Sequence, residues 1–539
     1  MAGEQTGVGI ADPALEAAAA PLLDKLVADG VAGKLAAQDP TLWGSDAEAE
    51  ASIRLSWTTL HKSSRPLIGE IEALRTQLRS EGIDRVVLAG MGGSSLAPEV
   101  IAATEGVALT VLDTTDPGQV ADALAGDLQR TVVVVSSKSG TTVETDSHRR
   151  IFAAAFREAG IDPARRLVVV TDPGSPLAEL GEAEGYRKVF LADPHVGGRY
   201  SALTAFGLVP AGLAGADVAR LLDQAALVAD AIAADSADNP ALRLAAALGA
   251  AHADGAEKVV LADTGSGIAG LGDWAEQLIA ESTGKQGTGL LPVVVENKDA
   301  PGFADAGSDA TPVAIGPATG AAKIAVAGPL GAQFLLWETA VAVAGRLLGI
   351  NPFDQPDVEA AKKAARSLLD NPDALRGTAE PSAVIGAVEV YASAGTTGEG
   401  TLADVLREFL ATAPEGGYLA VQAYLDRLDD ASASLLRSEL APRAGVQTTF
   451  GWGPRFLHST GQYHKGGHPN GIFLQLTGAA DDDLDVPDRP YSLGTLQLAQ
   501  ALGDGQVLAE HGRPVLRLHL TDRAAGLAEL MRAVQELAR

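Results

Sequence analysis

Cysteine is absent from the 539 residues of this chain. Its absence excludes disulfide bonds, thiolate metal sites and cysteine nucleophiles, and it is compatible with the cytoplasm, where we expect the protein to lie. Aromatic residues are also scarce, at 4%, whereas hydrophobic residues make up 46%. This composition favours helices packed closely on sheets over a β-sandwich, so we expect an α/β protein.

Basic residues are few as well. Lysine and arginine number 41 against 69 aspartates and glutamates, which gives a net charge of −28 at pH 7. Such a chain is repelled by nucleic acid and by anionic membrane surfaces, so neither is an expected partner. The most apolar stretch, residues 334–350, is interrupted by Glu338 and Arg346. We therefore expect no membrane span, and the sequence predicts no signal peptide.

The chain is longer than one hydrophobic core usually supports, so we expect two or three domains. Helical periodicity dominates the first 80 residues, and strands and helices then alternate, which implies parallel strands joined by right-handed crossovers. We expect an N-terminal helical segment over 1–80, α/β domains over 81–205 and 206–374, and a C-terminal α/β region over 375–539. The predicted strands are 85–89, 109–113, 131–136, 167–171, 188–191, 258–263, 291–296, 312–315, 323–327, 418–422, 446–450, 471–477 and 515–520.

Residues 132–145 are the most informative part of the sequence, because four valines are followed at once by Ser-Ser-Lys-Ser-Gly-Thr-Thr-Val-Glu-Thr. The valines predict a buried strand that ends in a turn before a helix. Free N–H groups at the helix start would suit the phosphate of a small molecule. The neighbouring hydroxyls that would help are those of Ser137, Ser139, Thr141, Thr142 and Thr145. The alternative is an ordinary helix cap rich in serine and threonine.

Two other glycine-rich turns follow predicted strands. Residues 89–96, Ala-Gly-Met-Gly-Gly-Ser-Ser-Leu, could bring the backbone close to a ligand, with Ser94 and Ser95 as donors. They lack the Gly-Lys-Ser/Thr ending of a Walker loop. Residues 265–270 match GxGxxG, so a nicotinamide-dependent oxidoreductase stays open as an alternative, although a lone match of this kind is weak evidence.

Three charged residues are candidates for chemistry. Glu281 ends a predicted helix before a glycine turn, where partial burial could raise its pKa toward the range that a general base needs. Arg199 follows two glycines, so its guanidinium could approach a ligand closely and stabilise negative charge. Lys362 lies on a helix predicted to begin at Pro356, and taken alone it would be a solvated lysine.

Three histidines, His458, His464 and His468, lie close together near the C-terminus and raise the possibility of a zinc site. No carboxylate shows the spacing of a known metal motif, and the surrounding glycines indicate a ligand turn instead. We therefore expect no metal. A proton carrier is the better interpretation of His458.

Taken in order, five segments resemble the glucose-6-phosphate isomerase family, which belongs to the sugar-isomerase (SIS) fold superfamily. They are Gly-Met-Gly-Gly-Ser at 90–94, Ser-Lys-Ser-Gly-Thr-Thr at 137–142, Gly-Gly-Arg-Tyr-Ser at 197–201, Glu-Ser-Thr-Gly-Lys at 281–285 and Asn-Pro-Phe-Asp-Gln-Pro at 351–356. The remainder resembles the isomerase part of actinobacterial transaldolase/isomerase fusions. The resemblance implies two doubly wound, parallel-sheet SIS domains followed by the C-terminal α/β region.

The resemblance also implies interconversion of glucose 6-phosphate and fructose 6-phosphate through a cis-enediol, with no metal and no organic cofactor. Glu281 would be the base, Arg199 would stabilise the enediolate, and Lys362 would assist ring opening. The phosphate would be bound by Ser137, Lys138, Ser139, Thr142 and Thr145, and the sugar would touch Gly93 and Ser94. The family's shared active site implies a homodimer.

One departure from the family concerns histidine. In typical members the ring-opening histidine lies shortly after the catalytic glutamate and comes from the neighbouring subunit, whereas here no histidine occurs between His252 and His458. His-Ser-Thr-Gly-Gln at 458–462 resembles the family's histidine motif, so His458 is the candidate for ring opening. Two alternatives also stay open: isomerisation of another sugar phosphate, such as mannose 6-phosphate, and a non-catalytic sugar-phosphate-binding regulator.

Overall fold

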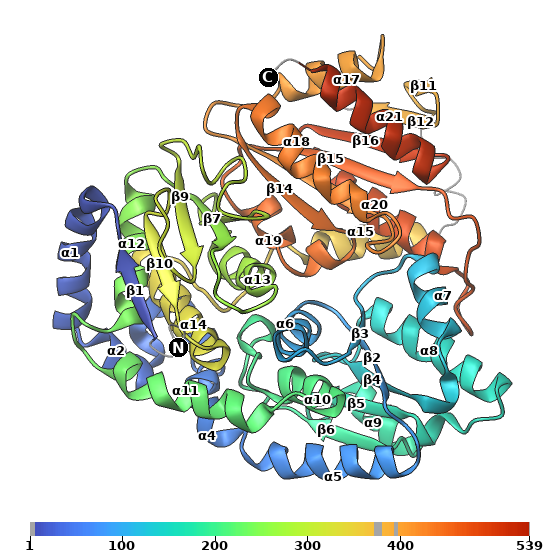
Figure 1. Cartoon of the computed structure of the whole chain (residues 1–539), viewed down its shortest axis with the longest axis horizontal. Helices are drawn as coiled ribbons and strands as arrows, with labels where there is room; N and C mark the ends of the chain where they lie inside the picture. Colours follow the sequence, from blue (N-terminus) through green and yellow to red (C-terminus); the bar gives the residue numbers. More distant parts are fainter. Residues whose placement is uncertain (1–5, 371–379, 393–396, 538–539) are drawn as a thin grey trace.

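The computed structural model describes residues 6–370, 380–392 and 397–537, and it contains three mainly parallel sheets, each with its own helices (Figure 1). The predicted α/β class is confirmed. Every strand predicted from the sequence is present, with some ends displaced by one or two residues. The domain boundary predicted between residues 374 and 375 lies outside the described residues.

The first sheet is wholly parallel, in the order β3-β2-β4-β5-β6. Its strands are β2 (Arg85–Gly90), β3 (Thr110–Leu112), β4 (Thr131–Ser136), β5 (Leu167–Thr171) and β6 (Lys188–Leu191). Both faces are buried: Val134 packs in the core that contains Phe206, whereas Val133 and Val135 pack in a second core with Phe152. The continuous valines of β4 follow from this double burial.

The second sheet has the order β1-β10-β9-β7-β8, and only its edge strand β1 is antiparallel to its neighbour. Its strands are β1 (Gly7–Ile10), β7 (Lys258–Asp263), β8 (Leu291–Val294), β9 (Ala310–Ile315) and β10 (Ile324–Ala327). One face shares the large core with the first sheet. The other face packs against the C-terminal region, where Val260 and Val293 share a cluster with Tyr418 and Phe473.

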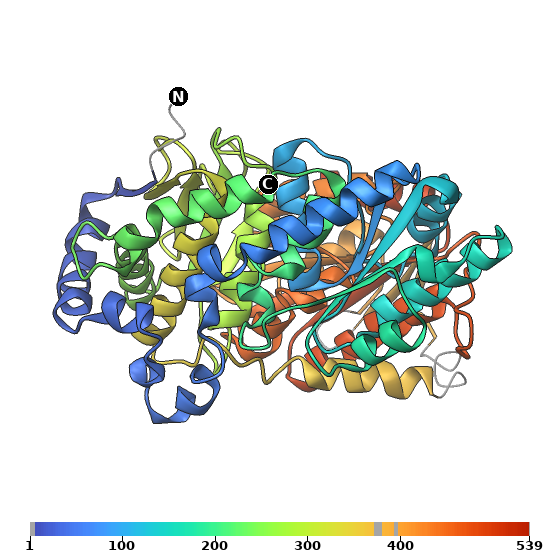
Figure 2. The same cartoon turned by 90° about the horizontal axis from the view of Figure 1, so that it is seen from below.

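The N-terminal segment is not wholly helical, contrary to the prediction from the sequence, because it begins with β1. This strand pairs with β10, and α1 packs against α12 at one end of the molecule (Figures 1 and 2). Val8 and Ile10 are the only larger apolar side chains of β1, too few to show a period of two. The beginning of the chain therefore completes the second sheet.

The third sheet has the order β11-β12-β16-β15-β13-β14, with four parallel strands and two antiparallel ones at one edge. Its strands are β11 (Ala383–Ile385), β12 (Val388–Ala392), β13 (Tyr418–Tyr424), β14 (Gln447–Trp452), β15 (Gly471–Gly478) and β16 (Val515–Leu520). The strands β11 and β12 were not predicted from the sequence, because they lie in a stretch that is rich in Pro, Gly, Ser and Thr.

The helices connect these strands and cover the sheets. The α-helices are α1 (Pro13–Ala28), α2 (Val31–Ala36), α3 (Ser45–Ala51), α4 (Leu60–Ser63), α5 (Pro66–Ser80), α6 (Leu96–Glu105), α7 (Pro117–Ala125), α8 (Val143–Glu158), α9 (Pro176–Ala183), α10 (Ala205–Ala214), α11 (Val218–Ala233), α12 (Pro240–Ala253), α13 (Leu271–Thr283), α14 (Leu330–Leu348), α15 (Glu359–Leu369), α17 (Leu402–Leu410), α18 (Leu435–Ala444), α19 (Gly461–Gly466), α20 (Leu493–Glu510) and α21 (Arg523–Glu536). The 3-10 helices are η1 (Pro40–Trp43), η2 (Ser56–Thr59), η3 (Gly92–Ser94), η4 (Leu128–Arg130), η5 (Pro163–Arg165), η6 (Gly198–Tyr200), η7 (Ala431–Ser434) and η8 (Arg455–His458). Among the described helices, none combines the length and apolar character that a bilayer crossing requires.

Strand order places one crevice in the first sheet. The chain passes from β2 to β3 on one side and from β4 to β5 on the other, although β2 and β4 are neighbours. In doubly wound sheets, ligands bind beyond the carboxyl ends of two such strands. The glycine-rich turn after β2 and the serine- and threonine-rich turn after β4 both lie at this point. In the third sheet, β13 and β15 have the same relation.

Candidate active site

Two glycines bring the turn after β2 into contact with distant segments. A Cβ added at Gly93 would lie 2.0 Å from the carbonyl oxygen of Gly198, and one at Gly92 would lie 2.8 Å from that of His458. Gly92 also has a φ of +55°, which side chains rarely adopt. Ser94 is buried in the same turn. The turn therefore requires glycine in order to touch the segments that carry Arg199 and His458.

Arg199 lies in η6 and is buried. Its Nε donates to Ser282 Oγ at 3.0 Å, and its Nη1 donates to Gln355 Oε1 at 2.8 Å and to Glu281 Oε2 at 3.4 Å. Its Nη2 donates to two carbonyls of the loop 352–354, at 2.7 and 2.8 Å. These contacts use all five donors of the guanidinium, so its orientation beside Glu281 is fixed.

Glu281 lies at the C-terminal end of α13, with its side chain only 12% exposed. Burial raises the pKa of Glu281, and the positive charges of Arg199 and His458 offset this only in part. One turn earlier, Gln277 Nε2 lies 3.5 Å from Glu281 Oε2 and donates to the His458 carbonyl at 2.9 Å. A buried carboxyl group with a raised pKa beside a fixed arginine has the properties of a general base.

His458 comes from η8 in the third unit, which consists of the third sheet and its helices. Its Nε2 lies 2.9 Å from Glu144 Oε1. Gln500 of α20 donates to the same oxygen at 2.7 Å. Burial disfavours the Glu144 carboxylate, but the charge and hydrogen bonds of His458, with that of Gln500, hold the pKa of Glu144 below its usual range. Because a carboxylate only accepts, Nε2 of His458 carries a hydrogen and Nδ1 is left for a ligand.

The turn after β4 leads directly into α8, whose second residue is Glu144. Thr142 is the N-cap residue, but its hydroxyl contacts Ser137 Oγ at 2.9 Å and does not cap the helix. Ser139 and Thr141 are exposed, with their hydroxyls 3.0 Å apart. Thr145 Oγ1 is buried and has no hydrogen-bond partner among the described residues. Hydroxyls and backbone donors thus surround the start of α8, as an anion site requires.

Two predicted lysines lie less directly at the site. The Lys138 ammonium pairs with Asp172 at 2.5 Å, so it would have to leave this partner to reach a phosphate at the turn. Lys362 is exposed on α15 and pairs with Glu359 at 2.9 Å; within the described chain, no contact joins it to the cluster around Glu281. Its helix begins at Glu359, not at Pro356, and packs against α20.

Local contacts argue against a nicotinamide site at the GxGxxG loop and a zinc site at the three histidines. In the GxGxxG loop, Asp263 Oδ1 accepts hydrogen bonds from the backbone of Gly265 and Ser266 at 3.0 and 2.8 Å, so a carboxylate already occupies these donors. The three histidines separate: His464 is buried beside Gln422, whereas His468 bonds to Glu257. Across the described residues, no group of three or more His, Cys, Asp or Glu side chains could hold a metal ion.

Comparison with known proteins adds independent information. The phosphoglucose isomerase family model matches residues 64–309. The protein named "Probable glucose-6-phosphate isomerase" from Natronomonas pharaonis is 30% identical over 346 residues, which cover 54% of this chain and 80% of that protein. The chain belongs to the phosphoglucose isomerase family.

Other members of the phosphoglucose isomerase family match over shorter stretches. A second "Probable glucose-6-phosphate isomerase", from Haloarcula marismortui, is 35% identical over 39% of this chain and 49% of its own length. The glucose-6-phosphate isomerase of Thermosynechococcus vestitus is 33% identical over 42% of this chain and 46% of its own length. The chain therefore spans about half the length of these two relatives.

Solved structures support the SIS-type fold of this phosphoglucose isomerase family member. A hypothetical protein from Thermus thermophilus aligns with a TM-score of 0.56 at 24% identity, covering 68% of this chain and all of that protein. A glucose-6-phosphate isomerase from Chlamydia trachomatis aligns with a TM-score of 0.52 at 20% identity, covering 67% and 86%. At these identities the likeness concerns the fold alone.

The family model covers only part of the candidate site. It includes both turns, Arg199 and Glu281, but it ends before Lys362 and His458. The structure nevertheless brings His458 to the cluster in one chain, through Glu144 and Gln277. The predicted similarity to actinobacterial fusion proteins stays a prediction.

Several residues of this cluster were not predicted from the sequence. Gln277 lies four residues before Glu281 on one helix, so helical spacing could have indicated it. Glu144 lies within the stretch 132–145 that contains the phosphate turn, but the sequence did not predict its contact with His458. Gln355 lies in the motif at 351–356. Gln500 had no local signal, because only the packing of α20 beside α8 brings it to Glu144.

Proposed function

We propose that this chain interconverts glucose 6-phosphate and fructose 6-phosphate through a cis-enediol intermediate. The observation that carries the proposal is the buried Glu281 carboxyl group, which has a raised pKa and lies 3.4 Å from a fully hydrogen-bonded Arg199. Family membership supports the same reaction.

Substrate capture would begin at the turn after β4. The start of α8 offers backbone donors, and Ser137, Ser139, Thr142 and Thr145 add hydroxyls that bind a phosphate group without a permanent charge. Lys138 would move from Asp172 to the phosphate. Gly93 and Ser94 would contact the sugar, since their turn lies against both η6 and η8.

Ring opening would use His458. Its Nδ1 faces away from the bond to Glu144, so it is the nitrogen available to exchange a proton with the ring oxygen or the C1 hydroxyl. Glu144 would hold the ring in place and stabilise the charged imidazole. Lys362 is retained as a second participant in ring opening, although its ammonium would have to leave Glu359.

Proton transfer between C2 and C1 would use Glu281. Its raised pKa brings the carboxyl group closer to the range in which one residue can take and return a proton. Arg199 would stabilise the negative charge that develops on the enediolate oxygens, and because its position is fixed it would need no reorganisation during the step. Water exclusion at this buried site would strengthen both effects.

The test compares wild type with Glu281→Gln in the conversion of fructose 6-phosphate to glucose 6-phosphate, with EDTA present and no added cofactor. Glutamine keeps the shape but cannot take a proton, so we expect a loss of about 10²- to 10⁴-fold in kcat. Glu415→Gln, at an exposed position outside the cluster around Glu281, is the matched control and should keep wild-type activity. Equal activity of Glu281→Gln and wild type would reject the assigned base.

Substrate specificity can be tested in the same assay. Mannose 6-phosphate differs from glucose 6-phosphate only at C2, and no described contact in the unliganded site selects one configuration. We propose glucose 6-phosphate because the relatives carry that name. Faster turnover of mannose 6-phosphate would change the assignment, while tight binding without turnover of either sugar would indicate a regulator.

We also propose that the protein acts as a homodimer in the cytoplasm, with the domain limits 1–80, 81–205, 206–374 and 375–539. The dimer rests on the family resemblance alone, because the one chain described here already supplies His458 to the cluster. The cysteine-free composition is compatible with a reducing compartment. Light scattering of the purified chain would measure the mass directly, and a monomer with full activity would remove the dimer from the proposal.

A further inference from the structure

Lys285 is a buried cation to which the proposed reaction gives no role. It follows Gly284, the C-cap residue of α13, and lies four residues after Glu281, with its side chain only 1% exposed. Its ammonium donates to the carbonyl oxygens of Asn351 and Asp354 at 2.8 and 2.7 Å, and to Asp354 Oδ1 at 2.8 Å. An ammonium has three N–H donors, so each of them has an acceptor in the loop 351–354.

The same loop holds Arg199. Its Nη2 donates to the carbonyls of Pro352 and Asp354 at 2.7 and 2.8 Å, and its Nη1 donates to Gln355, the next residue of the chain, at 2.8 Å. The Asp354 carbonyl oxygen therefore accepts from both Lys285 and Arg199, which uses its two lone pairs. The two cations are thus connected through a single oxygen atom, and a shift of the loop would move both.

The third unit fixes the backbone on both sides of this contact. Gln462 of α19 is fully buried, and its Nε2 donates to the Gly284 carbonyl at 2.9 Å and to Asp357 Oδ2 at 2.6 Å. Its Oε1 accepts from the Asp357 backbone N–H at 3.0 Å. A Cβ added at Gly284 would lie 2.5 Å from Tyr463 Cα, so the turn before Lys285 packs directly on α19. Lys285 therefore reaches the loop from a backbone that is itself held in place.

The charges that act on Lys285 come from three places. Arg199 lies in η6, Glu281 lies in α13, and Asp354 belongs to the loop itself. Burial and the charge of Arg199 lower the pKa of Lys285 to about 8, although the carboxylates of Asp354 and Glu281 oppose this shift. Lys285 is therefore charged at neutral pH and loses its proton as the pH rises past about 8. A neutral amine has only two N–H donors and no charge, so it holds the loop less firmly.

We propose that Lys285 is a positioning residue for the isomerisation, which holds the Arg199 guanidinium beside Glu281 by way of the loop 351–354. Lys285 does not touch the substrate in this proposal, because all three of its donors face the loop. The inference rests on the proposed function of Glu281 and Arg199. Stabilisation of an enediolate needs a donor that is already oriented, so a displaced guanidinium would lower kcat.

Lys285→Met tests this role, because methionine has a similar length but can neither donate a hydrogen bond nor carry a charge. We expect kcat for fructose 6-phosphate to fall about tenfold with little change in KM, since the phosphate turn after β4 is not altered. Wild-type kcat should also decline above about pH 8 toward that of the variant, whereas Lys285→Met should lack this decline. Steady-state kinetics from about pH 6 to pH 10 measures both effects.

Lys258→Met is the matched control. The Lys258 side chain is also only 1% exposed, and its ammonium contacts two carboxylates and the Gly416 carbonyl at the start of β7, outside the cluster around Glu281. Both variants should lower the free energy of unfolding, because each removes a buried and paired charge. Lys258→Met should nevertheless keep the kcat, the KM and the pH profile of wild type, which separates a positioning role from a structural one.

Asp354→Asn decides the question if Lys285→Met does not fold. The Asp354 side chain is 43% exposed, and its replacement removes a carboxylate that favours the charged form of Lys285. The decline of kcat at high pH should therefore begin at a lower pH than in wild type. Asp309→Asn, the same change beside Lys258, should leave the decline unchanged.

The inference is overturned if Lys285→Met has the kcat and the pH profile of Lys258→Met. Where Lys285→Met does not fold, it is overturned if Asp354→Asn and Asp309→Asn have the same pH profile. Failure of the proposed function would look different, because Glu281→Gln would then keep wild-type activity. Loss of activity in Glu281→Gln together with a wild-type profile in Lys285→Met would reject the role of Lys285 alone.

Discussion

At the scale of single residues, burial of Glu281 suits it to proton transfer but makes its ionised form unfavourable for the folded state. The folded protein binds the Glu281 proton more tightly than the unfolded chain does, because burial raises its pKa above the usual 4.5. The stabilisation from this proton is complete below about pH 4.5 and is lost as the pH rises through the raised value. At higher pH the ionised carboxylate makes the folded state less favourable.

Replacing Glu281 with glutamine should therefore have an effect on stability that depends on pH. Glutamine cannot ionise, so the Tm of Glu281→Gln should exceed that of wild type at pH 8, and the difference should disappear by pH 4. Thermal unfolding followed by circular dichroism at both pH values measures this. Glu415→Gln, at an exposed position, should give the same small change at both. A lower Tm for Glu281→Gln at pH 8 would contradict the effect of burial.

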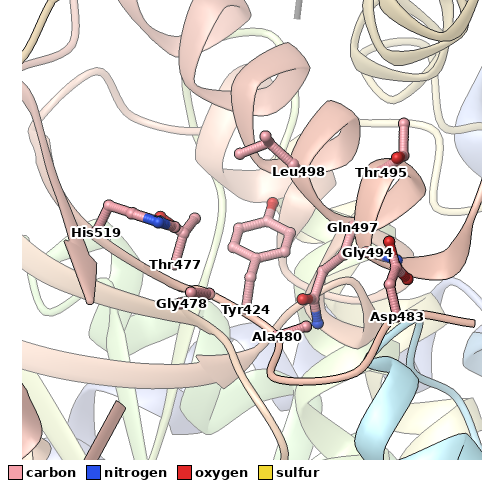
Figure 3. A pocket seen from close by; sticks show the side chains of 11 residues that line it. Tyr424, Thr477, Gly478, Ala480, Asp483, Gly494, Thr495, Gln497, Leu498 and His519 are labelled. Atoms are coloured by element: carbon pink, nitrogen blue, oxygen red, sulfur yellow. The ribbon is translucent and has the colours of Figure 1, made fainter. Parts of the chain in front are cut away.

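At the level of secondary-structure elements, α20 contributes to two places. Gln497 lines a cavity of about 270 Å³ at the carboxyl ends of β13, β15 and β16 (Figure 3). Gln500, one turn later, donates to Glu144 at 2.7 Å and accepts from Thr115 Oγ1 at 2.9 Å. Glu144 in turn bonds to His458. The helix thus helps to position the proposed ring-opening histidine through Glu144.

Gln500→Met tests this positioning role, because methionine has a similar volume but makes neither hydrogen bond. We expect kcat on fructose 6-phosphate to fall about five- to thirtyfold, equivalent to about 1–2 kcal/mol. The 5-deoxy analogue of fructose 6-phosphate cannot close its ring, so its turnover should change little. Steady-state kinetics with both substrates measures the difference.

Gln506→Met is the control on the same helix, since Gln506 is exposed and its side chain donates to Glu510 of α20 at 2.8 Å. It should leave the kinetics with both substrates unchanged. If Gln500→Met slowed both substrates equally, the helix would act on the whole site and the specific link to His458 would be wrong.

The same elements show how far the sequence could predict the fold. Periodicity and turn residues located every strand whose side chains are continuously apolar, such as β4, because burial of both faces leaves a strong pattern. They missed β1, whose four residues lie at a sheet edge and include two glycines. Short edge strands form by pairing with a strand far away in the sequence, and the local residue pattern carries no information about that partner.

The candidate site was predictable where its residues share a segment and unpredictable where packing assembles it. The two glycine-containing turns, Arg199 and Glu281 were located from local motifs. The contact between His458 and Glu144 joins residues 314 positions apart, and its existence depends on the docking of the third sheet. No motif in either segment predicts this contact.

Across the whole molecule, Arg455 is a residue that contacts all three units, each made of one sheet and its helices. It extends from η8 in the third unit to Glu99 at 2.6 Å and Asp113 at 3.0 Å in the first unit, and to Asp273 at 3.7 Å in the second. Burial disfavours the Glu99 carboxylate, but Arg455 and Arg427 outweigh it and lower the pKa of Glu99 to about 2. His458 lies three residues after Arg455, so this junction also positions the histidine segment.

Arg455→Met should therefore destabilise the folded chain by about 3 kcal/mol at pH 7, because it removes the nearer of two arginines from the buried Asp113 carboxylate and leaves Glu99 with Arg427 alone. The lowered pKa of Glu99 means that its stabilising contribution is complete above about pH 4.5 and is lost as the pH falls toward 2. The gap between wild type and variant should consequently narrow at pH 3. Urea unfolding at the two pH values measures the gap.

Arg407→Met supplies the comparison, since Arg407 is exposed and pairs with Asp404 of the same helix at 2.6 Å. An exposed pair of this kind contributes little, so the variant should stay within about 0.5 kcal/mol of wild type. If Arg455→Met were as mild as Arg407→Met, packing and not this charge cluster would hold the units together. If the difference in unfolding free energy between wild type and Arg455→Met were the same at pH 7 and pH 3, protonation of Glu99 would not affect it. The ion pair between Arg455 and Glu99 would then contribute nothing to stability.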